Sequence, residues 1–148
     1  MTGPEVGLDE QSQYLNEAAQ GIAERVPAGW STAEFKYVAA AGTSSYRVNV
    51  TMSDGTDVET NDVPLTVVRA MSRLRRAMHD EHQGTWFTAT ITVDQSGRYK
   101  TDFEYDSEPH FPVAISPKSF VEDLERFPRD EENIPPWLQE KLHEANES

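Results

Sequence analysis

The sequence contains no cysteine among its 148 residues. Disulfide bonds, thiolate nucleophiles and metal sites built from cysteine are therefore excluded. The chain also lacks an apolar run near the roughly 20 residues that a membrane-spanning helix needs. Its first residues, MTGPEVGLDEQ, have neither the basic start nor the apolar segment of a signal peptide. We therefore expect a cytoplasmic protein that does not bind membranes.

Positive charge is scarce. Lysine and arginine number 13 against 26 aspartates and glutamates, which gives a formal net charge of -13. Unspecific binding to nucleic acid or to anionic lipid requires a positive surface, so we expect neither. The charge is complementary to a basic partner, although it also serves solubility.

The spacing of apolar residues predicts two longer helices. The first covers residues 9–26 and stops at Pro27 and Gly29. The second begins near Pro64, which suits a first helical turn because its missing N–H has no partner to lose there. Its expected buried face is Val67, Met71, Leu74 and Met78, with Arg69, Arg73, Arg75 and Arg76 on other faces.

Alternation of apolar and polar residues predicts about five strands. Two are joined through AAGTSS at residues 40–45, a short one follows the Asp-Gly turn at 54–55, and two flank the turn at 94–97. Hairpins join most of them. We therefore predict an α+β fold, in which an antiparallel sheet carries helices on one face.

The length favours a single domain over residues 1–148. Residues 1–8 are interpreted as a flexible leader. Residues 109–148 are interrupted by prolines and are expected to form short C-terminal helices.

The segment TDFEYDSEPH carries the strongest local charge pattern. In a strand over residues 98–106, Asp102, Glu104 and Asp106 project from one side at intervals of about 6.5–7 Å, and Glu108 follows. An acid/base pair would need one carboxyl group in an apolar or charge-coupled place. Lys100 lies on the same side of the predicted strand, and a lysine is typical of an open, solvated face.

A straight row also lacks the wrapped loop that calcium requires. We therefore assign no catalytic residue, metal or cofactor, and predict that the acidic row binds a partner.

Trp86 falls on the polar side of the predicted strand TWFTATITV. It is either an exposed contact anchor for the partner or covered by a C-terminal helix. The sequence leaves both interpretations open.

The arginines Arg69, Arg73 and Arg76 lie at helical spacing, so they form one stripe. They either face a partner or a phosphate group, or pair with surplus carboxylates such as Asp80 and Glu81. We favour pairing.

The tetrapeptide HDEH at residues 79–82 places His79 and His82 near a helix end. Zinc needs about three protein ligands, and the other histidines lie in unrelated segments. We interpret these residues as solvated side chains at a frayed helix terminus.

Several segments together resemble the YezG-type immunity proteins, the antitoxin partners of bacterial polymorphic toxins. They are the helix YLNEAAQGIAERVPAGW, two strands before a DGT turn, and the run WFTATITVDQSGRYKTDFEYD. The resemblance covers about residues 14–108, and ERFPRDEENIPPWL is also similar. It implies a small α+β protein, without catalytic residues, that binds and neutralises a cognate toxin domain, often a nuclease. An acidic face fits this role because nuclease surfaces are usually basic.

Two other functions remain open. One is a regulatory module for a different basic protein, and the other is a small-ligand-binding protein or an enzyme with an unrecognised site. An edge strand of the sheet would also offer a place for pairing with a second copy of the chain.

Overall fold

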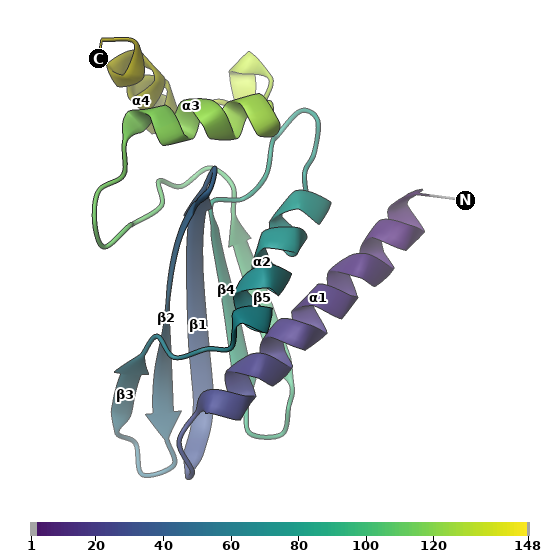
Figure 1. Cartoon of the computed structure of the whole chain (residues 1–148). Helices are drawn as coiled ribbons and strands as arrows, with labels where there is room; N and C mark the ends of the chain where they lie inside the picture. The colour runs from purple at the N-terminus through teal and green to yellow at the C-terminus, as the bar shows by residue number, and fades with distance from the viewer. Residues whose placement is uncertain (1–2, 148) are drawn as a thin grey trace. The chain divides into compact units, whose positions relative to one another are not determined.

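The computed structural model describes residues 3–147, with side chains from Asp9 onwards (Figure 1). Its elements are α1 (Gly3–Arg25), β1 (Trp30–Ala40), β2 (Thr43–Met52), β3 (Asp57–Thr60), α2 (Leu65–Ala77), β4 (Thr88–Asp94), β5 (Tyr99–Glu104), α3 (Pro117–Arg126), the 3-10 helix η1 (Glu131–Asn133) and α4 (Pro136–Glu147). The first helix thus begins before the predicted start at residue 9. Of the predicted leader, residues 1 and 2 lie outside the described part of the chain.

The five strands form one antiparallel sheet in the order β3-β2-β1-β4-β5. In the β2–β3 hairpin, Val48 lies opposite Thr60 and Thr51 opposite Asp57. The predicted α+β fold with a five-stranded antiparallel sheet is confirmed. Within residues 3–147, no helix combines the length and apolar composition that crossing a membrane requires.

The chain divides into two compact units, each defined by the contacts among its own residues. The first unit comprises Met1–Tyr37, Tyr46–Met78 and Thr90–Asp102, and the second comprises Val38–Ser45, His79–Ala89 and Phe103–Ser148. Strands β1, β2, β4 and β5 contribute residues to both units, so neither unit is a continuous stretch of sequence.

In the first unit, α1 and α2 pack against each other and lie over the same side of the strands (Figure 1). Gly21 of α1 allows this approach, because a Cβ atom there would clash with Val67 of α2. The buried apolar residues include Ala18, Ile22, Val67, Met71, Leu74, Phe35, Val48, Val50, Ile91 and Val93. These side chains give the first unit its hydrophobic core.

The buried face of α2 follows the prediction at Val67, Met71 and Leu74, which are fully buried, whereas Met78 is half-buried. Arg75 differs from the prediction. It is buried with 4% exposure, because it lies four residues after buried Met71 on the same face of the helix. The other three arginines of the helix are exposed.

In the second unit, α3 and α4 pack together. Four buried residues, Ala40, Phe87, Phe120 and Leu138, form its core, against which Phe111, Ile115, Leu124, Ile134 and Trp137 pack. The rings of Phe87, Phe120 and Trp137 meet edge to face, with centroids 5.4 to 5.9 Å apart. Such aromatic contacts stabilise a core beyond the area that they bury.

The buried carboxylate of Asp123 on α3 holds the turn between β1 and β2. It accepts a hydrogen bond of 2.7 Å from the backbone N–H of Ala41. Ala41 adopts a positive φ of 54°, a conformation that costs a residue with a Cβ atom free energy. The bond from α3 compensates part of this cost.

Candidate partner-binding site

The predicted acidic row is not one continuous strand. Asp102 is exposed on β5 and belongs to the first unit. Glu104, the last residue of β5, is half-buried, and its carbonyl accepts a bond of 3.0 Å from the Phe87 N–H. Asp106 and Glu108 are exposed but lie beyond the end of the strand, so the regular spacing predicted for Asp106 is wrong.

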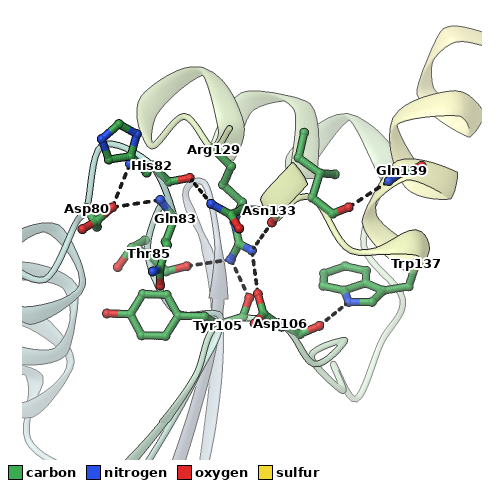
Figure 2. Close-up of polar contacts among 11 residues, drawn as sticks. Asp80, His82, Gln83, Thr85, Tyr105, Asp106, Arg129, Asn133, Trp137 and Gln139 are labelled. Atoms are coloured by element: carbon green, nitrogen blue, oxygen red, sulfur yellow. Dashed lines mark hydrogen bonds and ion pairs between the residues drawn. The ribbon is translucent and has the colours of Figure 1, made fainter. Parts of the chain in front are cut away.

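Arg129 binds the first carbonyl group after the end of β5, that of Tyr105. Its guanidinium donates to the backbone oxygens of Tyr105, Thr85 (3.2 Å) and Asn133 (3.0 Å) (Figure 2). It also donates to Asp106 Oδ1 at 3.1 Å, and lies 5.3 Å from the centre of the Phe87 ring. The Arg129 side chain is only 1% exposed, so this forked cation is an internal connector of the second unit.

Two residues of α4 contact the same turn. Trp137 Nε1 donates a hydrogen bond of 2.7 Å to the backbone oxygen of Asp106 (Figure 2). Lys141 Nζ lies 4.0 Å from Glu108 Oε2. We call residues 105–108 the acidic turn. Its backbone is fixed at Asp106, whose side chain keeps 79% of its surface exposed.

Trp86 is not an exposed anchor. It is completely buried and its ring lies 5.6 Å from that of Phe103. The predicted alternation placed it on the polar side of a strand, but β4 begins only at Thr88, so the alternation does not extend to Trp86. From Ala89 to Val93 the predicted alternation does hold, with Ala89, Ile91 and Val93 buried.

His82 joins the turn after α2 to the segment before η1. His82 Nδ1 lies 2.9 Å from Asp130 Oδ2, and the Asp130 N–H donates to the His82 carbonyl at 2.8 Å. The hydrogen bond to Asp130, followed by attraction to its charge, raises the pKa of His82. These residues therefore form a defined contact and not the frayed terminus that the sequence predicted.

Asp80 shapes the same turn. Its Oδ1 accepts hydrogen bonds from the N–H groups of His82 (2.8 Å) and Gln83 (2.9 Å), which lower the pKa of Asp80 (Figure 2). Among the residues whose side chains are described, no three histidines, aspartates or glutamates are placed to hold a metal ion together.

The arginine stripe of α2 has no carboxylate partner among residues 9–147. Arg69, Arg73 and Arg76 are exposed, and no ion pair joins them to Asp80, Glu81 or another described carboxylate. Among the side chains that the structure describes, the favoured pairing with surplus carboxylates is therefore not found, and it stays a prediction. The Asp80 carboxylate instead accepts hydrogen bonds from the backbone N–H groups of its own turn.

The family model described as "Immunity protein YezG-like" matches residues 22–132, well over half of the chain. The chain belongs to this family. The match confirms the resemblance from residue 22 onwards and extends it to residue 132. No curated protein matches the chain.

The YezG-like match includes Arg129 and every residue of the acidic segment. Trp137 and Lys141, which hold the acidic turn from α4, lie beyond its end. The turn is thus built from residues within the family match and fixed by residues that follow it.

Sequence reasoning missed Arg129 and its role. The segment ERFPRDEENIPPWL contains both Arg129 and Trp137, but its pattern does not reveal their partners. The carbonyls that Arg129 binds at Tyr105 and Thr85 lie 24 and 44 residues away in the chain. The one local signal was that this cation directly follows Phe127 and Pro128.

Proposed function

We propose that this YezG-like immunity protein neutralises a cognate nuclease toxin domain in the cytoplasm by binding a basic surface through its acidic residues. These are Asp102, Glu104, Asp106 and Glu108. Trp86 is no longer included, because it is buried. Nuclease surfaces that bind phosphates are basic, so an acidic inhibitor is drawn to them and competes with the substrate.

The presentation of Asp106 carries this proposal. Buried Arg129 fixes its side chain and half-buried Trp137 its backbone, yet the carboxylate stays largely exposed. A charge that is already positioned loses little conformational freedom on binding. The net charge of -13 supports the same partner chemistry at long range.

The test is reversal of charge on β5. Asp102→Lys together with Glu104→Lys should lower the association rate with the cognate toxin domain, and should weaken the dependence of that rate on salt. Electrostatic steering accounts for about 10- to 1,000-fold in such rates, so a loss of at least about tenfold at low salt is expected. The toxin domain is used in a catalytically inactive form, and surface plasmon resonance at two salt concentrations measures the rates.

Glu122→Lys with Glu125→Lys provides the matched control, because both residues are exposed on α3 and the change in net charge is the same. Equal losses in the two double variants would contradict the assignment to the acidic residues of β5. Asp106 is left unchanged, since a lysine there would lie against buried Arg129. Cleavage of DNA or RNA by the active toxin then decides whether it is a nuclease, and the immunity protein should inhibit this cleavage.

A further inference from the structure

The loop between β5 and α3 is fixed at several points. At its start, the Asp106 carbonyl accepts the hydrogen bond from Trp137. Further along, Phe111 and Ile115 pack against the core of the second unit. At its end, the Ser116 hydroxyl accepts a hydrogen bond of 3.2 Å from the Lys118 N–H and caps α3.

Between Phe111 and Ile115, the chain turns three apolar residues outward. Residues 112–114, with the sequence Pro-Val-Ala, are all exposed. Val113 keeps 79% of its surface exposed, more than Leu65 (67%) or Val58 (41%), the other exposed large apolar residues of the described chain. We call residues 112–114 the apolar tip.

The apolar tip is suited to binding because its conformation is already restricted. Anchors on both sides and the fixed φ of Pro112 reduce the freedom that the loop would lose in a complex. Charged residues mainly set the rate and specificity of association, whereas apolar side chains that fill pockets supply much of the affinity. The acidic residues alone therefore leave the source of tight binding unassigned.

We propose that the apolar tip inserts into an apolar pocket on the toxin domain, and that basic residues surround this pocket. This inference rests on the proposed function. The expected basic rim follows from charge complementarity, since exposed Asp106 and Glu108 precede the tip in the same loop. Val113 is the central contact.

The test compares Val113→Asp with Leu65→Asp. Both exchange an exposed apolar side chain for a carboxylate and change the net charge equally, but Leu65 lies at the start of α2 in the first unit. Added negative charge by itself favours a basic partner. A weaker complex would therefore report the lost apolar contact and not electrostatic repulsion.

We expect Val113→Asp to raise the Kd for the inactive toxin domain at least about tenfold, mainly through faster dissociation. Leu65→Asp should change it less than about twofold. Thermal unfolding of both variants checks that the fold is kept, and Val113→Ala, which adds no charge, should weaken binding in the same direction.

The outcomes separate the two proposals. If wild type binds the toxin domain and Val113→Asp binds as tightly, the apolar tip is not the contact, while the proposed function stands. If wild type does not bind the toxin domain at all, the proposed function fails and this inference fails with it. Equal weakening by Leu65→Asp would also contradict the specific role of the tip.

Discussion

Arg129 is the single residue with the widest set of polar contacts at the candidate site. We predict that Arg129→Lys lowers the free energy of unfolding by about 1–3 kcal/mol, because one ammonium group leaves some buried acceptors without a donor. Urea unfolding measures the loss. Arg126→Lys, at an exposed position on α3, is the matched control and should stay within about 0.5 kcal/mol of wild type. Equal stability of both variants would contradict the role assigned to Arg129.

His82 gives the stability of the protein a dependence on pH. Because Asp130 raises the pKa of His82 in the folded state, the contribution is fully present below the ordinary value of 6.5 and is lost as pH rises through the raised value. Glu81, 3.4 Å from His82 Nε2, and Asp80 act in the same direction. We predict that His82→Gln lowers Tm more at pH 5.5 than at pH 8.5, values chosen around the histidine range.

Asp80 does not add to the pH dependence of stability between pH 5.5 and pH 8.5. Its pKa is lowered, so its contribution is present above the ordinary value of 3.8 and is lost only as pH falls through the lowered value. Asp130→Asn should reduce the pH-dependent part of the His82 effect, since Asp130 is the largest cause of the raised pKa while Glu81 and Asp80 remain. His110→Gln, at an exposed position, corrects for loss of a histidine. A His82→Gln effect that is independent of pH would refute the ion pair.

At the scale of elements, the contact between α1 and α2 depends on Gly21. Alanine normally favours a helix over glycine by about 1 kcal/mol, but here its Cβ would clash with Val67. We predict that Gly21→Ala is nevertheless destabilising, by about 1–2 kcal/mol.

The double variant Gly21→Ala, Val67→Ala tests the cause of that loss. Because the smaller side chain at residue 67 leaves room for the new Cβ, it should be more stable than the sum of the two single effects by about 1 kcal/mol. Chemical denaturation of all four proteins gives the coupling. Additive effects would mean that the two helices do not meet at this pair.

The elements also show why some predictions succeeded. The alternation in β4 and the buried face of α2 are local patterns. Residues close in the sequence were therefore sufficient to place Ile91, Val93, Met71 and Leu74 in the core. Trp86 was misplaced because strand alternation was extended past the true start of β4. A homodimer through an edge strand stays a prediction, and the charged Asp57 and Glu59 of edge strand β3 oppose such pairing.

At the scale of the whole molecule, the sequence predicted the α+β fold and the family, since both depend on the order of local segments. It did not predict the cross-connections of the acidic turn. Arg129, Trp137 and Lys141 reach this turn from positions more than 20 residues away, and no local pattern specifies such partners. The candidate site was therefore located by its charge, while its geometry required the structure.

Segments of the two units alternate along the chain. This order limits where the protein can be truncated or recombined without disrupting a unit. The first unit needs three separate stretches of sequence, and so does the second. A truncation that removes one unit would also cut strands β1, β2, β4 and β5, which contribute residues to both units. Minimal fragments for toxin neutralisation therefore cannot be obtained by trimming at an internal boundary. Recombination between related immunity genes is expected to preserve function only when it exchanges nearly the whole coding region.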